Sequence, residues 1–336
     1  MNEEQIRRLQ ARRAATLSVS QIVDGVLAGD RATLARAITL IESSRAEDQD
    51  KADELLERCI AERVESIRTG ITGVPGAGKS TFIESLGTFL TRECGEKVAV
   101  LAVDPSSPVT GGSILGDKTR MPRLSVDPNA FIRPTPSRGS IGGVSVKTRE
   151  TILLCEAAGF ANILVETVGV GQSETAVASM TDFFLLLMIA GAGDELQGMK
   201  RGIIEMWDLI AINKAEGENR VRAEAARQQY KSALRLFPPS GKGWQLKVVT
   251  CSALTGLGVA EIWGTISSYR DQMTANGKFQ ARRADQAKRA MYRAIEQELV
   301  GRFFSDPDTR RKLAAAEKDV EEGRLSSYRA ARQLLK

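Results

Sequence analysis

The stretch Gly73-Val-Pro-Gly-Ala-Gly-Lys-Ser80-Thr81 decides the fold of this chain. It follows a short apolar run, Ile67–Thr72, and it opens a helical pattern over Lys79–Arg92. A strand, a glycine-rich loop ending in Gly-Lys-Ser and a helix, in this order, are typical of a phosphate-binding P-loop. Glycines let backbone N–H groups crowd around a phosphate, and the helix adds the positive end of its dipole. We therefore expect a nucleotide to bind here, with Lys79 on the β- and γ-phosphates and Ser80 on Mg²⁺. The expected nucleotide-binding residues of the loop are Gly73, Val74, Pro75, Gly76, Ala77, Gly78, Lys79, Ser80 and Thr81.

Length and composition describe a globular protein with room for two domains. The chain has 336 residues, of which 42% are hydrophobic and 26% charged. The longest apolar run, Phe183–Ala192, is too short to span a bilayer. The N-terminus has no apolar signal-peptide region, so we expect a cytoplasmic protein, or a matrix protein if a transit peptide has been removed. The four cysteines are widely spaced, and we expect them to be reduced and mostly buried.

Two further properties of the composition restrict the function. The chain has no histidine, which removes histidine acid–base catalysis and the commonest transition-metal ligand. A role in nickel or zinc delivery is therefore disfavoured. The net charge of +5 comes partly from basic clusters near both ends. Because acidic residues are interleaved with them and no aromatic platform accompanies them, we expect neither a nucleic acid nor a membrane as partner.

Hydrophobic periodicity predicts helices at both ends and an α/β domain between them. Residues 1–66 are expected to form an N-terminal helical region, in which Asp30 caps a helix over Arg31–Ser44 and a second helix covers Glu47–Ser66. Residues 67–275 are expected to form a doubly wound, mostly parallel sheet. Its strands are expected at Ile67–Thr72, Lys97–Val103, Ala130–Ile132, Asn162–Glu166, Asp182–Ile189, Leu209–Asn213 and Lys247–Thr250.

The C-terminal part, residues 276–336, is expected to be helical and to follow a break at Asn276-Gly277. Four apolar residues recur there at a spacing of four: Met291, Ile295, Leu299 and Phe303. Such a stripe is either core or a dimer interface, and the sequence leaves both interpretations open.

Acidic residues that follow strands are candidates for the metal and for the attacking water. Asp104 ends the second strand, and Asp117 lies in the glycine-rich loop Gly111–Lys118. Glu166-Thr-Val-Gly169 stands where nucleotide hydrolases place a DxxG, with Glu in place of Asp. We expect Ser80, Asp104, Asp117 and Glu166 around Mg²⁺, and Lys79, Asp104, Asp117, Glu166 and Gly169 to act in catalysis. Gln172 belongs to the expected second switch, and Pro134–Gly143 is either a further switch or a plain surface loop.

The base is expected to be guanine. Asn213-Lys214-Ala215-Glu216 ends an apolar strand and resembles NKxD, in which the carboxylate accepts hydrogen bonds from guanine N1–H and the exocyclic amine. Adenine presents an acceptor at N1 and is rejected by the same group. Glu216 replaces the usual Asp, which leaves ATP open as the alternative. Ser252, Ala253 and Leu254 fit the second base-contacting loop.

With these motifs in place, the chain resembles the G-protein chaperones of methylmalonyl-CoA mutase, the MeaB/ArgK type. The distinguishing stretches are Val103–Ser107, Gly111–Met121, Val165–Glu174 and Gly191–Gly198. The resemblance implies a P-loop GTPase with an N-terminal helical extension and a C-terminal dimerisation arm, and therefore a homodimer. It implies GTP or GDP with Mg²⁺ as ligands, and an adenosylcobalamin-dependent acyl-CoA mutase as partner.

The resemblance further implies a function as a switch. Members of this family use GTP binding and hydrolysis to gate cofactor loading of the mutase and to protect it. It implies an additional switch segment over Gly191–Lys200, with Asp194, Gln197 and Lys200 as its informative residues. Three alternatives remain: a kinase or regulator linked to arginine and ornithine transport, a metal-insertion GTPase, and a binding module that never hydrolyses its nucleotide.

Overall fold

The computed structural model describes residues 17–43, 45–104, 120–136, 141–167, 172–191, 205–235 and 243–335. By their contacts, the residues divide into two compact units, the first ending at Arg283 and the second beginning at Ala284. The domain boundaries expected at residues 66/67 and 275/276 stay a prediction.

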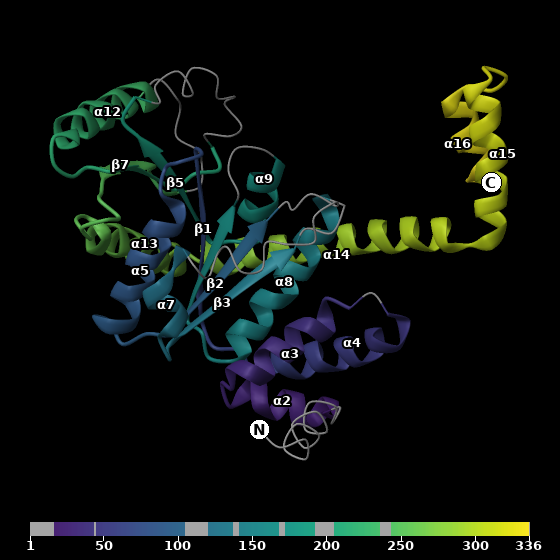
Figure 1. The fold of residues 1–336 in the computed structure, drawn as a ribbon, viewed down its shortest axis with the longest axis horizontal. Coiled ribbons are helices and arrows are strands. Elements are labelled where there is room, and N and C mark those ends of the chain that lie inside the picture. The colour runs from purple at the N-terminus through teal and green to yellow at the C-terminus, as the bar shows by residue number, and fades with distance from the viewer. Residues whose placement is uncertain are drawn as a thin grey trace, which may run out of the picture. The chain divides into compact units, whose positions relative to one another are not determined.

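The first unit is built on a parallel sheet of seven strands (Figure 1). The strand order is β3-β2-β4-β1-β5-β6-β7, and each pair of neighbours is parallel. This confirms the predicted doubly wound α/β fold, with all described strands parallel. The strands are β1 (Ile67–Gly73), β2 (Val98–Asp104), β3 (Ala130–Pro136), β4 (Asn162–Thr167), β5 (Phe183–Ile189), β6 (Leu209–Asn213) and β7 (Lys247–Thr250).

Helices cover both faces of the sheet, which explains why its central strands are almost wholly apolar. One layer contains α5 (Lys79–Arg92), α7 (Pro122–Val126) and α13 (Val259–Ala275), in which α5 contacts both of the others. The other layer contains α8 (Ile141–Ala157) and α9 (Gln172–Ala178), which contact each other. Figure 1 shows the two layers on opposite sides of the sheet. Helix α12 (Asn219–Leu234) packs on β6 and β7.

Three N-terminal helices extend the hydrophobic core beyond the sheet: α2 (Val19–Leu27), α3 (Arg31–Ile41) and α4 (Ala46–Ala61). They contact one another, and each contacts α8. Asp30 caps α3 as predicted, because its carboxylate accepts a 2.7 Å hydrogen bond from the backbone N–H of Thr33. The predicted extension of α4 to Ser66 is wrong. The helix ends at Ala61, and the backbone N–H of Val64 already donates to the carbonyl of Glu156, on the way into β1.

A buried ionic cluster lies at the amino ends of the central strands. Arg68 of β1 donates two hydrogen bonds, of 2.7 and 2.9 Å, to the Glu156 carboxylate of α8. The hydroxyl of Ser66 donates to the same carboxylate at 2.5 Å. Arg283 donates to both oxygens of Asp182 and to the carbonyl of Ser66. Arg68 and Glu156 are 3% and 1% exposed, so each buried charge depends on the other for compensation.

The C-terminal helices follow the predicted break. Gly277 has φ +71° between α13 and α14 (Lys278–Ser305), a backbone conformation that favours glycine. Helices α15 (Pro307–Glu321) and α16 (Ser327–Leu334) complete the chain and contact each other. On α14, Met291, Ile295 and Leu299 are 52%, 47% and 62% exposed and Phe303 is half-buried, so three of the four stripe residues are not core within this chain.

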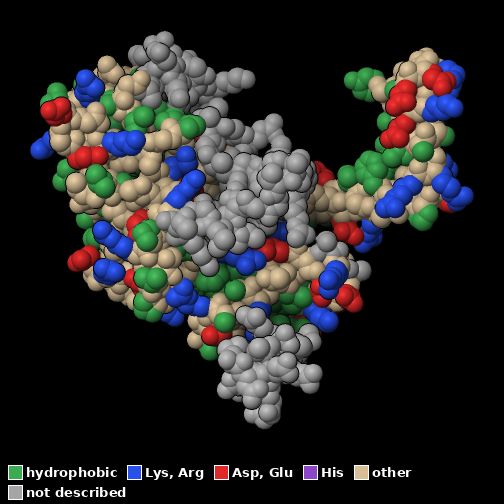
Figure 2. Space-filling view, viewed as in Figure 1, with side chains coloured by type: hydrophobic (Ala, Val, Ile, Leu, Met, Phe, Trp, Pro, Cys, Tyr) green, Lys and Arg blue, Asp and Glu red, His purple; other side chains and the backbone are tan. Residues whose placement is uncertain are grey.

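The visible surface carries charges of both signs, and the described helices differ from a membrane span in length or hydropathy. Lys and Arg side chains are interspersed with Asp and Glu on the face seen in Figure 2. Among the helices that the structure describes, none combines the length and the apolar character needed to cross a bilayer.

Candidate nucleotide-binding site

The P-loop joins β1 to α5 at the carboxyl edge of the sheet. Two of its glycines are required by geometry. A Cβ on Gly73 would lie 2.3 Å from the carbonyl oxygen of Leu187, so only glycine lets β1 pass this close to β5. Gly78 caps α5 with φ +85°, and no side chain caps this helix start. The first N–H groups of α5 are therefore not capped by a side chain, as an anion-binding helix terminus requires.

Lys79 is held inside the loop by the backbone. Its Nζ donates a 2.9 Å hydrogen bond to the carbonyl of Gly73. Burial lowers the pKa of Lys79, while the nearby carboxylates of Glu166 and Glu174 act in the opposite direction. The amine therefore stands at the base of the loop, with two acidic residues close enough to favour its charge.

Ser80 and Glu166 form an oxygen pair beside the loop. The Ser80 hydroxyl donates to the Glu166 carboxylate at 3.0 Å. Hydroxyl and carboxylate oxygens are the ligand types that Mg²⁺ prefers, so this pair fits that ion. Asp104 ends β2 at the same edge, where its neighbour Val103 pairs with Thr167 of β4, but the Asp104 side chain lies outside the described atoms.

Asn213 ties the predicted base motif to the P-loop. It ends β6 and is 1% exposed. Its Nδ2 donates to the carbonyl of Ala77 at 2.7 Å, and its Oδ1 accepts from the backbone N–H of Ala253 at 2.9 Å. One amide side chain thus connects the phosphate loop with both loops predicted to contact the base. The two base loops are also joined by a 2.9 Å bond from the N–H of Ala215 to the carbonyl of Cys251.

One oxygen of the Glu216 carboxylate, Oε2, is buried without a hydrogen-bond donor in the described part of the chain. A buried carboxylate oxygen without a donor is costly, and the N1–H and amine of guanine are donors of the kind it needs. Lys214, the residue after Asn213, has φ +61°, which turns the chain out of β6 toward Glu216. The proposed recognition of guanine therefore depends on Glu216 Oε2, an acceptor to which no described residue donates.

The second base loop follows β7. Ser252 is fully buried, and its hydroxyl accepts from the backbone N–H of Thr255 at 3.1 Å, which fixes the turn. Ala253 is 7% exposed and Leu254 is 76% exposed. Leu254 is thus an accessible apolar side chain beside the buried turn.

Several predicted residues lie outside the described part of the chain. These are Asp117, Gly169, Asp194, Gln197 and Lys200. Gln172 begins α9, and its side chain is not described. The stretch Pro134–Gly143 is not one loop, since β3 continues to Pro136 and α8 begins at Ile141. Residues 137–140 between them lie outside the described residues.

The sequence interpretation missed a hydrogen-bonded chain under the P-loop. Thr167 donates to Thr72 at 2.8 Å, and Thr72 donates to Glu174 at 2.8 Å. Thr72 directly precedes Gly73, and Thr167 directly follows Glu166. Their adjacency to two motifs at strand ends was the available signal, but only strand pairing brings the side chains together.

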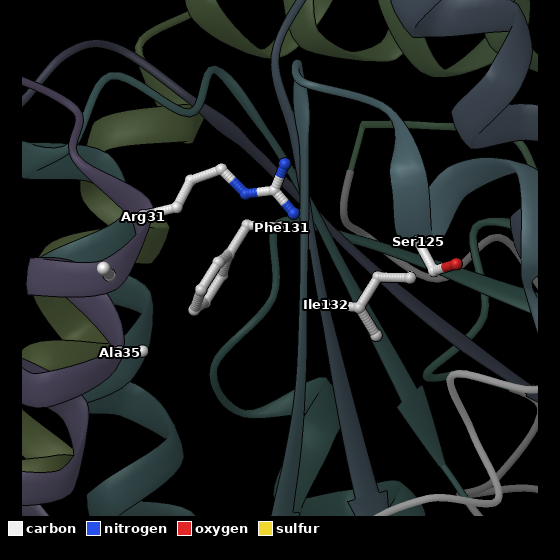
Figure 3. A pocket seen from close by; sticks show the side chains of 6 residues that line it. Arg31, Ala35, Ser125, Phe131 and Ile132 are labelled. Carbon is white, nitrogen blue, oxygen red and sulfur yellow. The ribbon is translucent and has the colours of Figure 1, made fainter. Parts of the chain in front are cut away.

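A separate pocket of about 250 Å³ lies between α3 and the start of β3 (Figure 3). Its lining is mostly apolar, and the guanidinium of Arg31 is held at its edge by a 2.9 Å bond to the carbonyl of Asp127. Because β3 is the edge strand and Phe131 and Ile132 lie near its amino end, this pocket is not part of the carboxyl-edge site. The lining residues are Arg31, Ala32, Ala35, Ser125, Phe131 and Ile132.

Fold and site together define a P-loop GTP hydrolase, and the comparisons with known proteins agree. A solved structure described as "Crystal structure of LAO/AO transport system kinase" is 40% identical, with a TM-score of 0.73, and the match covers 94% of this chain and 96% of that one. "Probable GTPase Rv1496" of Mycobacterium tuberculosis is 49% identical over 318 residues, 95% of this chain and 94% of the relative.

The particular family follows from a match over most of the chain. The model of the family "Methylmalonyl Co-A mutase-associated GTPase MeaB" matches residues 34–308. The mouse protein "Methylmalonic aciduria type A homolog, mitochondrial" is 46% identical over 328 residues, 95% of this chain and 79% of the relative. The chain therefore belongs to the MeaB family of GTPases.

Proposed function

We propose that this GTPase is a chaperone of an adenosylcobalamin-dependent acyl-CoA mutase of the methylmalonyl-CoA type. In this function it gates the loading of the cofactor into the mutase and protects the mutase from inactivation. The observation that carries the proposal is the family match over residues 34–308, whose description names association with methylmalonyl-CoA mutase. The site supports it, because a switch needs a nucleotide pocket whose parts are mechanically connected. Asn213 provides such a connection between the P-loop and the base loops.

The deciding experiment measures GTP hydrolysis with and without purified methylmalonyl-CoA mutase. We expect the mutase to stimulate hydrolysis, and we expect GTP, but not a non-hydrolysable analogue, to support transfer of adenosylcobalamin to the apo-mutase. Lys79→Ala should abolish both effects, while Glu62→Gln, an exposed change after α4, should alter neither. If no mutase stimulates hydrolysis or binds this protein, the chaperone proposal fails while the GTPase assignment stands.

Mg²⁺ is proposed as the metal of this site. Ser80 and Glu166 would hold it, with Asp104 and Asp117 as the further acidic residues of the set. The ion would supply neutralisation of phosphate charge during hydrolysis. The 3.0 Å contact between Ser80 and Glu166 supports this assignment, since both oxygens are already gathered beside Lys79. Chelation by EDTA should stop hydrolysis and added Mg²⁺ restore it, and Ser80→Ala should raise the Mg²⁺ concentration required. Full activity in EDTA would contradict the assignment.

A homodimer through the C-terminal helices is part of the proposal. Met291, Ile295 and Leu299 are about half exposed along one side of α14, and covering them with a second copy would remove this apolar area from water. Light scattering should give a dimer for the wild type and a monomer for Leu299→Glu. The control Gln297→Glu changes charge on the opposite side of the helix and should stay dimeric. A wild-type monomer would refute this part.

The protein is proposed to act in the cytoplasm. Its four cysteines, three of them buried, are all unpaired, which suits a reducing compartment. Fractionation of cells that produce the untagged protein tests this, and recovery from a membrane or secreted fraction would refute it.

A second candidate function is favoured by the name of one solved relative, "LAO/AO transport system kinase". Under this reading the γ-phosphate of the nucleotide passes to a protein linked to arginine or ornithine uptake. Incubation with GTP labelled on its γ-phosphate and a candidate acceptor protein of arginine or ornithine uptake distinguishes the two. Label on the binding protein would support the kinase, and release of all label as phosphate would support the GTPase switch.

A further inference from the structure

The buried chain Thr167–Thr72–Glu174 lies directly under the P-loop, and none of its three residues is among the expected nucleotide-binding, metal-binding or catalytic residues. Both threonines are fully buried, and Glu174 is 5% exposed. Glu174 belongs to the first turn of α9, Thr72 is the residue before Gly73 on β1, and Thr167 ends β4. Three separate elements are therefore joined by two side-chain hydrogen bonds of 2.8 Å each.

The direction of these bonds follows from the chemistry of the groups. A threonine hydroxyl has one proton to donate. Thr72 gives its proton to Glu174, so it accepts from Thr167, and the chain must end on a group that accepts. An ionised carboxylate is such a group, and hydrogen bonds to a charged acceptor are stronger than those between neutral groups. Glu174 thus sets the orientation of both hydroxyls.

The same carboxylate acts on the P-loop lysine. Lys79 donates to the carbonyl of Gly73, the neighbour of Thr72, so the Glu174–Thr72 bond and the lysine contact meet on consecutive residues of β1. Burial raises the pKa of Glu174, and its hydrogen bond with Thr72 and the charge of Lys79 offset part of this effect. The acid and the amine are therefore electrostatically coupled, and their contacts lie on two consecutive residues of β1.

We infer that Glu174 is a positioning residue for GTP hydrolysis. Through Thr72 it holds the start of α9 in a fixed arrangement with the end of β1, where Gly73 accepts the hydrogen bond of Lys79. It acts through these residues and does not itself touch the nucleotide. The inference uses only the GTPase activity and is independent of the proposed mutase partner, because it concerns hydrolysis by the protein alone.

A functional role of this kind differs from a purely structural one in its kinetics. Glu174→Gln keeps the size and an acceptor oxygen but removes the charge, and Thr72→Val removes the hydroxyl with its shape retained. Each should lower kcat about tenfold, because Glu174→Gln replaces a charge-assisted hydrogen bond with a weaker neutral one and Thr72→Val removes the bond. KM and GDP affinity should stay within about threefold, because no phosphate contact is removed. Thr72→Ser keeps the hydroxyl and should retain most of kcat.

The test is steady-state GTP hydrolysis by the full chain without any mutase, with GDP affinity and melting temperature measured for every variant. The double variant Thr72→Val/Glu174→Gln should lose no more kcat than the more impaired of the two single variants, since both changes act on the same Thr72–Glu174 bond. Glu93→Gln, an exposed acid just after α5, is the matched control and should match the wild type.

Three results would overturn the inference. The first is wild-type kcat in Glu174→Gln, and the second is additive losses of kcat in the double variant. The third is a lower melting temperature together with a KM that rises by as large a factor as kcat falls. If Glu174→Gln does not fold, the comparison of Thr72→Val with Thr72→Ser decides alone. In that case equal kcat values for the two threonine variants would refute the inference.

Discussion

Replacing Asn213 with Ala tests whether the P-loop and the base loops form one mechanical unit. The side chain is 1% exposed and makes two short bonds, of 2.7 Å to the Ala77 carbonyl and 2.9 Å from the Ala253 N–H. Truncation leaves both backbone groups without that partner, and Ala77 and Ala253 are themselves 0% and 7% exposed. Each buried orphan group costs about 1–3 kcal/mol. The free energy of unfolding should therefore fall by about 2–6 kcal/mol.

Urea unfolding followed by circular dichroism measures this loss, with and without GDP. We expect bound GDP to contact both loops, so the added stability that GDP gives the wild type should be much smaller in Asn213→Ala. Asn219→Ala is the matched control, since its amide donates to the Lys214 carbonyl at 2.6 Å in an exposed position and its loss should cost less than about 1 kcal/mol. A loss below about 1 kcal/mol in Asn213→Ala, or undiminished stabilisation by GDP, would refute the reasoning.

Three further predictions follow from buried and exposed groups. Glu156→Gln leaves the Arg68 guanidinium buried and uncompensated, so the free energy of unfolding should fall by about 3–5 kcal/mol in a urea titration. Glu216→Ala should lower GTP affinity about a hundredfold or more and leave ATP affinity unchanged in a fluorescent-nucleotide competition, because only guanine donates to this carboxylate; equal losses for both nucleotides would contradict the base assignment. Cys94 is exposed while Cys155 is fully buried, so DTNB should label Cys94 but not Cys155 in the folded protein. Burial, Glu96 and Glu93 raise the pKa of the Cys94 thiol, so its labelling rate should still be increasing at pH 9, and a plateau below pH 8.5 would contradict this.

Motifs and periodicity predicted most of the fold because the signals are local. The strand, glycine loop and helix around Gly73 predicted β1 and α5 closely, and the apolar run before Asn213 predicted the bounds of β6. Propensity could not show where α4 ends, because helical residues continue past Ala61. The end is decided by the pairing of Val64 with the Glu156 backbone, a contact between residues far apart in the chain.

In the nucleotide site, too, some features follow from local sequence and others from contacts between distant residues. The sequence by itself determined the P-loop around Gly73–Thr81 and the positions of Glu166, Asn213 and Glu216, because each chemistry needs a particular residue type at or just beyond the end of a strand. Only the tertiary structure decided what these residues touch: that Asn213 is bonded to Ala77, and that Glu174 reaches Thr72. Such bonds join residues distant in sequence, and they depend on the strand order and register of the sheet. A phosphate-binding loop is therefore readable from one segment, whereas the connections that link it to the rest of the site appear only when the strands are packed side by side.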